Sequence, residues 1–327
     1  MQTVLTKSPV VAAKFIKRGG IAAFPTETVY GLGANVFDAA AIEKIFAAKQ
    51  RPADNPLIAH VGEIDQIELI AVDITDNAQK FIDAFFPGPL TVVLPKTSSV
   101  PDAATAGLDT IGVRMPKNEL AREFLQACGT PVVAPSANIS GRPSPTSWQA
   151  VFEDMDSRID CILQGDITEI GLESTVVDCT GEIPLVLRAG SVSLEMLQRI
   201  VPATQIYQFD GDDAARSPGM KHRHYAPRAN VILTDPGSQI IDSKAEFSDL
   251  SFQIIDSGSK AFIGLTKQNK DFALTKICKS ADEYAALFFE FFRECDRQKI
   301  EIIYCETIAE TGIGVALMDR LRRAAER

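Results

Sequence analysis

The 327-residue sequence predicts a two-domain α/β protein. Short runs rich in β-branched and aromatic residues alternate with amphipathic helical segments, which is the pattern of α/β folds. The alternation stops in the segment DGDDAARSPGMKHRHYAP, where Gly, Asp, Pro and Arg accumulate, and resumes after it. The length also suits two domains, because single cores seldom grow past about 250–300 residues. We therefore expect a large first domain at 1–202, a linker at 203–228 and a smaller second domain at 229–327.

The first domain is predicted to alternate strands and helices along its length. Its strand candidates are short apolar runs bounded by turn residues, and they lie at 20–25, 56–61, 90–94, 111–115, 131–135, 159–163, 175–178 and 185–187. Its helix candidates carry apolar residues three or four positions apart, and they lie at 39–49, at 76–86, from about 118, at 147–155 and from Ser193 to about 202. Pro87-Gly88-Pro89 ends the second of these helices, because proline cannot continue a helix.

The second domain repeats the alternation on a smaller scale. Strand-like runs lie at 230–235, 251–256, 261–266 and 300–307. A helix with one apolar face opens at Ser280-Ala-Asp-Glu283, which is a capping box. A last helix is predicted at 314–327. These elements predict a small, open, Rossmann-like α/β sheet.

Composition excludes several classes of protein. The net charge is −10, whereas a protein that coats nucleic acid needs a wide basic surface, so we expect no stable nucleic-acid binding. No run of eighteen uncharged apolar residues is present and the N-terminal segment has no cleavage site, so we expect a cytoplasmic protein without a membrane span. The six scattered cysteines and only three histidines predict free thiols and no metal site formed by protein side chains.

The familiar nucleotide-binding motifs are absent. There is no G-x-x-x-x-G-K-[ST] sequence, and Gly312-Ile-Gly314 lacks the third glycine of a dinucleotide fingerprint. There is also no G-x-S-x-G nucleophile elbow. A bound nucleotide must therefore be held by a different arrangement.

Two polar segments follow directly on regular elements. PTETVYGLG at 25–33 follows a buried strand, and open α/β sheets hold ligands in loops at the carboxyl ends of strands. The alternative is an ordinary hydroxyl-rich turn. Lys49 and Arg51 stand at a helix end and suit a polyphosphate clamp, because arginine offers a fork of donors and lysine a mobile point charge. The alternative is that these two cations only complement the helix dipole.

Three further segments carry polar groups where a plain structural segment would not. The loop APSANISGRPSPT at 134–146 offers hydroxyls, an amide and backbone N–H groups to phosphate oxygens, although such residues also form ordinary turns. Arg114 and Arg188 stand inside apolar strands, so each needs an anionic partner. That partner is either a ligand or an internal carboxylate such as Glu173 or Asp178. The third segment, Glu173-Ser174-Thr175, brings a hydroxyl pair into a strand.

The order of these segments resembles a known family. The series PTETVYGLG, K-x-R, FFPGPLTVVL, TAGLDTIGVRMP, PSANISGRPSPT, ESTVVD and LRAG is similar to the YrdC-type domain of threonylcarbamoyl-AMP synthases. The linker SPGMKHRHYAP and the tail resemble the two-domain form of that family. Two positions depart from the family pattern: Gln50 stands where a glycine is expected, and Asp319 where an asparagine is expected.

The resemblance implies a fold, a reaction and a site. It implies a large, open, twisted mixed sheet in the first domain, and an enzyme that makes threonylcarbamoyl-AMP and pyrophosphate from L-threonine, bicarbonate or CO2, and ATP with Mg²⁺. Separate proteins then transfer the product to the tRNA adenosine beside the anticodon. The residues implied to bind ATP are Lys49, Arg51, Ser136, Asn138, Ser144, Arg188 and, as part of a lid, Tyr225. The residues implied to shape the threonine and carbamate pocket are Thr26, Tyr30, His60, Thr105, Arg114 and Ser174.

The sequence assigns no catalytic base, and two rival functions remain open. His60 is either a proton acceptor or a hydrogen-bonded structural residue. One rival is carbamoyl-adenylate formation from carbamoyl phosphate, although the acylphosphatase-like and cysteine-rich segments of such proteins are missing from this sequence. The other is an RNA-binding module, which the acidic charge and the lack of an aromatic stacking stripe argue against.

Overall fold

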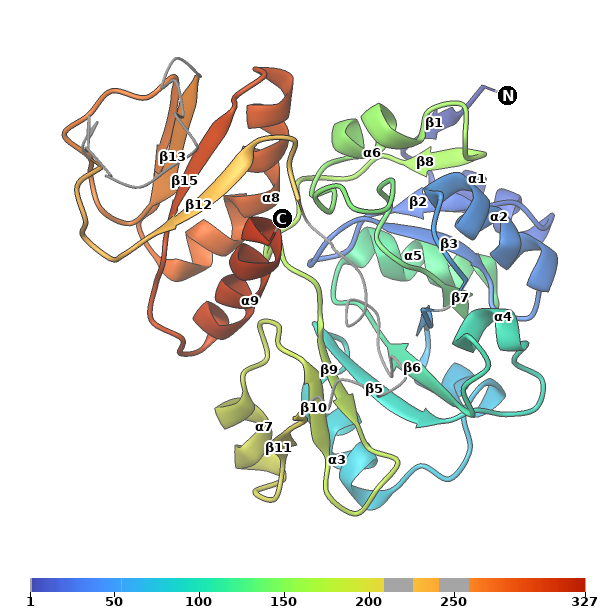
Figure 1. The fold of residues 1–327 in the computed structure, drawn as a ribbon. Coiled ribbons are helices and arrows are strands. Elements are labelled where there is room, and N and C mark those ends of the chain that lie inside the picture. The colour runs from blue at the N-terminus through green and yellow to red at the C-terminus, as the bar shows by residue number, and fades with distance from the viewer. Residues whose placement is uncertain (1, 54, 209–225, 241–258, 327) are drawn as a thin grey trace.

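The computed structural model describes residues 2–53, 55–208, 226–240 and 259–326. These residues form two α/β units that lie side by side, as Figure 1 shows. The first holds a large mixed sheet and the second a small parallel sheet, as predicted. The predicted strand at 251–256 and most of the predicted linker lie outside the described residues. In the part of the chain that is described, no helix is long and apolar enough to cross a membrane.

The sheet of the first unit mixes parallel and antiparallel pairs; β2, for example, is parallel to β8 and antiparallel to β3. Among the described residues its strand order is β1 (Val4–Thr6), β8 (Cys161–Leu163), β2 (Ala22–Phe24), β3 (Gly31–Asn35), β7 (Val132–Val133), β4 (Ile58–His60), β6 (Thr110–Arg114), β5 (Leu90–Pro95), β9 (Thr175–Asp178), β10 (Leu185–Arg188) and β11 (Gln205–Ile206).

Helices cover both faces of this sheet, and strand residues alternate between the two resulting cores. Ala22 and Phe24 pack with α1 (Pro9–Lys17) and α5 (Glu119–Cys128). Ala23, between them, belongs to the other core. That core includes residues of α2 (Ala39–Lys49), α3 (Asp76–Phe85), α4 (Asp102–Thr105), α6 (Trp148–Met155) and α7 (Leu194–Ile200) and the 3-10 helix η1 (Ile64–Leu69). The period-two alternation thus buries both faces of the central strands.

Six described elements of the first unit and its border were not predicted. They are β1, α1, β3, η1, α4 and β11. The last of these lies inside the predicted linker and pairs with β10, which keeps the chain in the first sheet as far as Ile206. By contrast, α2 has the predicted bounds, and α7 begins after the predicted cap Ser193. The helix α6 begins one residue later than predicted, because Ser147 caps it.

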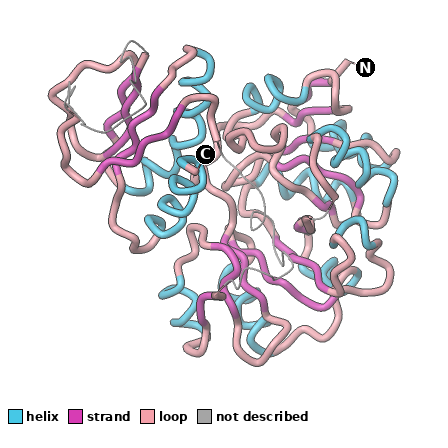
Figure 2. Tube along the Cα trace, viewed as in Figure 1, coloured by secondary structure: helices cyan, strands magenta, loops and turns pink. Residues whose placement is uncertain are grey.

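The second unit has a parallel sheet with its helices on the side of the first unit (Figures 1 and 2). Among the described residues the strand order is β12 (Asn230–Thr234), β15 (Ile302–Glu306), β13 (Lys260–Gly264) and β14 (Leu274–Ile277), of which β14 was not predicted. The helices are α8 (Ala281–Arg297) and α9 (Ile313–Ala325). The hydroxyl of Ser280 caps α8 by accepting the N–H of Glu283, which is one half of the predicted capping box. The Glu283 carboxylate accepts the N–H of Lys279 rather than that of Ser280.

A buried carboxylate stands at the end of β15. Glu306 accepts hydrogen bonds from the backbone N–H groups of Gly237, Leu265 and Thr266 at 2.8, 2.5 and 2.8 Å. The Thr266 hydroxyl donates a fourth bond at 2.6 Å. Burial alone would raise the pKa of Glu306, but these bonds hold it below its usual value. Glu306 therefore joins the loops that follow β12 and β13.

The two units share apolar packing. Val29 and Leu172 of the first unit belong to the core of the second. Gly171 allows the closest approach, since its φ is +76° and a Cβ there would lie 2.6 Å from the backbone of Ala286 in α8. All six cysteines of the chain lie within the described residues, and each is buried and free, which confirms the prediction of free thiols.

Candidate active site

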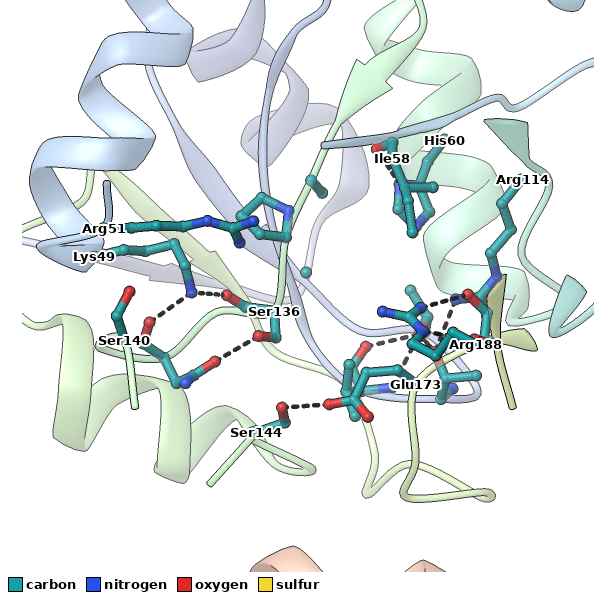
Figure 3. Close-up of a pocket in the computed structure, with 18 of the residues that line it drawn as sticks. Lys49, Arg51, Ile58, His60, Arg114, Ser136, Ser140, Ser144, Glu173 and Arg188 are labelled. Carbon is teal, nitrogen blue, oxygen red and sulfur yellow. Dashed lines mark hydrogen bonds between the residues drawn. The ribbon is translucent and has the colours of Figure 1, made fainter. Parts of the chain in front are cut away.

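Most of the predicted site residues line one hollow in the first unit (Figure 3). The hollow has about 740 Å³ of empty space, part of it open to solvent. The predicted residues among its lining are Thr26, Lys49, Arg51, His60, Arg114, Ser136, Asn138, Ser144, Ser174 and Arg188. They come from seven separate segments, so the fold brings together residues that lie far apart in the sequence.

Lys49 and Arg51 lie at the C-terminal end of α2. The Lys49 ammonium group is buried and donates to the carbonyl oxygens of Ser136 at 2.5 Å and Asn138 at 2.7 Å. Burial, and next the charge of Arg51, lower the pKa of Lys49 well below its usual value. Between the two cations, Gln50 has φ 52° and ψ 43°, the left-handed conformation that glycine adopts at least cost. The departure from the family pattern therefore falls on a strained position.

The loop between β7 and α6 is held by its own side chains. The Ser136 hydroxyl donates to the Asn138 side-chain oxygen at 2.6 Å. The Asn138 amide in turn donates to the carbonyl oxygens of Ile139 and Arg142, both at 2.9 Å. This bonding fixes the path of the loop around the hollow before any ligand enters.

Arg114 has an internal partner, although not one of the two carboxylates that the sequence suggested. Its guanidinium forms a buried ion pair with Glu27 at 2.7 Å and donates to the Thr28 hydroxyl at 2.8 Å and the Gly88 carbonyl at 3.1 Å. The expectation of Glu173 or Asp178 was wrong for this arginine. Sequence reasoning missed Glu27; the only signal was an acidic residue directly after a buried strand.

Arg188 and Glu173 occupy the other side of the hollow. Arg188 donates to the Ser174 carbonyl and the Ser174 hydroxyl, both at 3.1 Å. Glu173 accepts from the Ser144 hydroxyl at 2.6 Å and from Arg320 of α9 at 3.2 Å. Sequence reasoning considered Glu173 only as a partner for a strand arginine and missed its link to the second unit.

His60 is buried against the Phe24 ring at a centroid distance of 5.7 Å. One ring nitrogen lies 3.2 Å from the Ile58 carbonyl oxygen. Burial, followed by the charge of Arg114, lowers the pKa of His60 to about 3. The ring is therefore neutral near pH 7, and it lines the hollow as an uncharged group.

Two predicted residues, Tyr30 and Thr105, do not line the hollow, and a third lies outside the described residues. Tyr30 is buried, with its hydroxyl donating to the Asp166 carbonyl at 3.2 Å and accepting from the Gly165 N–H at 3.1 Å, and burial raises its pKa. Thr105 is buried at the end of α4, and its hydroxyl has no partner among the described residues. Tyr225 lies outside the described residues, although the next residue, Ala226, donates to the Gly141 carbonyl at 3.0 Å.

The hollow is suited to an anion with several oxygens. Lys49, Arg51 and Arg188 stand on it from two sides, with serine hydroxyls between them (Figure 3). Cations and hydroxyls arranged in this way bind phosphate oxygens, and a forked arginine contact adds direction. The chain as a whole is acidic, so this concentration of positive charge distinguishes the hollow.

Family comparisons cover nearly the whole chain. Residues 14–190 match the Sua5, YciO and YrdC family, described as "Telomere recombination". Residues 192–326 match the C-terminal domain of threonylcarbamoyl-AMP synthase.

Individual relatives agree over the same span. A threonylcarbamoyl-AMP synthase of Pyrococcus abyssi is 43% identical over 96% of this chain and 93% of its own length. One from Bacillus subtilis is 36% identical over 98% and 94%. The crystal structure of P. abyssi Sua5 with L-threonine superposes with a TM-score of 0.88 at 39% identity, covering 99% of this chain and 97% of that one. The chain therefore belongs to the two-domain threonylcarbamoyl-AMP synthase family.

Proposed function

We propose that this chain forms L-threonylcarbamoyl-AMP and pyrophosphate from L-threonine, bicarbonate or CO2, and ATP. The names of the full-length relatives and the threonine held by the P. abyssi structure support the substrates. The observation that carries the proposal is the convergence of Lys49, Arg51, Asn138 and Arg188 on one hollow. A site that only needed to be stable would not gather three cations around empty space, because like charges repel there.

We assign the two halves of the hollow to the two substrates. Lys49, Arg51 and Arg188, with the hydroxyl and amide groups of Ser136, Asn138 and Ser144, hold the ATP phosphates. Thr26, His60, Arg114 and Ser174 surround the threonine carbamate. We also assign Tyr30 and Thr105 to shaping that pocket, and Tyr225 to a lid.

The proposed reaction depends on position rather than on a strong base. The neutral amine of threonine adds CO2 and releases a proton to water, which gives a carbamate. A carbamate oxygen attacks the α-phosphorus of ATP, the bond from the α-phosphorus to the oxygen that bridges to the β-phosphate breaks, and pyrophosphate leaves. Holding the two reactants in line can supply about 7–11 kcal/mol in favourable systems. The cations of the hollow stabilise the departing pyrophosphate. His60 is neutral near pH 7, because its pKa is about 3, and is therefore a weak base. We assign it to lining the pocket and offering a hydrogen bond, not to accepting the proton.

Magnesium enters this proposal on the nucleotide. Among the described residues no cluster of three or more metal-binding side chains is present. Among the described residues that line the hollow, Glu173 carries the carboxylate. Its oxygens already accept hydrogen bonds from Ser144 and Arg320. The donor set thus fits a metal that ATP phosphates carry, where Mg²⁺ would neutralise charge on the leaving group.

The proposal extends to the fate of the product. An adenylate is an activated acid that water hydrolyses, so we propose that it passes promptly to separate proteins that modify tRNA adenosine. We place the reaction in the cytoplasm, where ATP, bicarbonate and tRNA are available. The acidic chain supports a small-molecule role rather than stable RNA binding.

One experiment tests the proposed function directly. The full chain is incubated with ATP, Mg²⁺ and bicarbonate and with each amino acid in turn, and pyrophosphate release is followed. We expect release with L-threonine that falls when bicarbonate is removed, and a product with the mass of threonylcarbamoyl-AMP. Salt-dependent RNA binding without amino-acid-dependent turnover would favour the RNA-binding alternative instead.

A further inference from the structure

Two buried arginines of the second unit reach the loop that borders the hollow. Arg293 of α8 is 4% exposed and Arg320 of α9 is fully buried. Each directs part of its guanidinium into the first unit, and Arg320 also pairs with Asp319 of its own helix at 2.9 Å. Burying an arginine costs several kcal/mol unless its charge is paired, so these contacts need an account beyond simple packing.

Arg293 contacts the loop both directly and through a carboxylate. It donates to the Pro143 carbonyl at 2.6 Å and pairs with Asp154 of α6 at 2.8 Å. Asp154 also pairs with Arg142 of the loop at 2.8 Å. Burial alone would raise the pKa of Asp154, but the two arginines hold it below its usual value, so it remains an anion between them.

Arg320 repeats this arrangement on the other side of the loop. It donates to Glu173 at 3.2 Å, and Glu173 accepts from the loop hydroxyl of Ser144 at 2.6 Å. In each case a buried first-unit carboxylate joins a second-unit arginine to a residue that lines the hollow. The other end of the loop is held within the first unit, by Lys49.

We propose that Arg293 and Arg320 are positioning residues for ATP. Through them, the second domain fixes residues 142–144 of the loop between β7 and α6, which borders the proposed phosphate site. This inference rests on the proposed function for the identity of the ligand. It gives the second domain a role in the reaction although its own sheet does not border the hollow. Hydrogen bonds continue from Arg142 to a proposed ATP-binding residue, because the Asn138 amide donates to the Arg142 carbonyl.

The test compares Arg293→Met with a matched control on the same helix. Asp154 keeps Arg142 as a partner in this variant, so the fold is expected to survive. The control is Arg297→Met, because Arg297 also reaches α6, through Glu153 at 3.1 Å, but that pair is exposed and does not touch the loop. We expect Arg293→Met to raise KM for ATP about tenfold, since small misplacements of binding groups have large effects, with KM for threonine changed less than about twofold.

Further variants separate positioning from mere stability. Arg293→Lys keeps the charge but loses the fork, so its KM for ATP is expected to be intermediate. Arg320→Lys is expected to raise KM for ATP in the same direction. If Arg293→Met does not fold, the double variant Arg293→Met with Asp154→Asn also removes the buried negative charge that has lost one of its two arginines, and it is expected to fold with KM for ATP still raised.

The inference is overturned if folded Arg293→Met, or the double variant, has the same KM for ATP as Arg297→Met, or if both substrates are affected equally. If the wild-type chain releases no pyrophosphate in response to threonine, that result instead counts against the proposed function. Even then, equilibrium titration with ATP alone tests the inference: weaker binding to Arg293→Met than to Arg297→Met supports it, and equal binding overturns it.

Discussion

Arg188 is the residue whose environment separates function from stability most clearly. It is half-buried on β10, and two of its described bonds reach a single residue, Ser174. Its guanidinium lines the open hollow, where it is placed to contact the oxygens of an anionic ligand. Its loss removes stabilisation of the transition state while the sheet around it stays intact.

We therefore expect Arg188→Ala to fold normally but to lose pyrophosphate release by about 10²- to 10³-fold, the usual effect of removing one such donor. Activity and circular dichroism are compared with those of Arg199→Ala, an exposed arginine on α7. Turnover close to that of the control would remove Arg188 from the phosphate-binding set.

Gln50 offers a substitution that stabilises the protein. A side chain in the left-handed region costs roughly 1–2 kcal/mol, part of which glycine loses again through its greater freedom in the unfolded chain. Gln50→Gly is expected to raise the free energy of unfolding by about 1 kcal/mol with activity retained. Urea denaturation measures the change, and a destabilised variant would show that the Gln50 side chain makes a larger contribution than its backbone strain.

His60 predicts a pH dependence of stability. Its pKa is about 3 in the folded chain, against an ordinary 6.5. As the pH falls below 6.5, the unfolded chain takes up a proton that the folded chain refuses until about pH 3, so stability is complete above pH 6.5 and declines below it. Between pH 7 and 4 the wild type is expected to lose about 3 kcal/mol more than His60→Asn. If urea titrations show that both proteins lose the same free energy of unfolding over this range, His60 in the folded chain takes up its proton at the ordinary pKa.

At the scale of elements, the strand pair β9–β10 depends on a close approach at Gly190. A Cβ there would lie 2.7 Å from the Ser174 carbonyl carbon and 2.8 Å from the Glu173 oxygen, and would also clash with the Thr175 nitrogen. Gly190→Ala is expected to displace this segment, costing about 1–3 kcal/mol of stability and much of the activity. Gly181→Ala, at an exposed position with open space around it, is the control. Equal denaturation midpoints and rates in both variants would contradict the argument.

The elements that the sequence predicted are those with strong local signals. The capped, amphipathic helices and the β-branched strands fall within a few residues of their expected bounds. β3 was missed because Gly31-Leu-Gly-Ala-Asn35 reads as a turn, yet its glycines are required by packing: a Cβ at Gly33 would lie 2.6 Å from the Val132 side chain. Tertiary contact overrides propensity in such a strand.

The same limit applied to the site. Local sequence identified the loops and cations, because polar residues that follow buried strands stand out. It could not pair Arg114 with Glu27, or connect Glu173 to Arg320, since these partners are far apart in the chain and only the folded sheet brings them together. Roles carried by the family resemblance for Tyr225 lie outside the described residues and stay predictions.

At the scale of the whole molecule, the interface predicts that the first unit does not work alone. A chain that ends at Gln208, just after β11, would expose Val29 and Leu172 and leave Asp154 and Glu173 without their second-unit arginines. We expect it to lose most pyrophosphate release and to melt at a lower temperature than the full chain. A truncated protein as active as the full chain would show that the second unit is dispensable for the chemistry.

Glu306 explains why the anion site lies in the larger sheet and not in the smaller one. In parallel α/β sheets the backbone amides beyond the strand ends commonly receive an anion. In the second unit those amides, from the loops after β12 and β13, are already bonded to the chain's own carboxylate. A phosphate arriving there would meet a resident negative charge with its donors engaged. Glu306 thus occupies the position in the smaller sheet where an anionic ligand would bind, and the nucleotide site is left to the first unit.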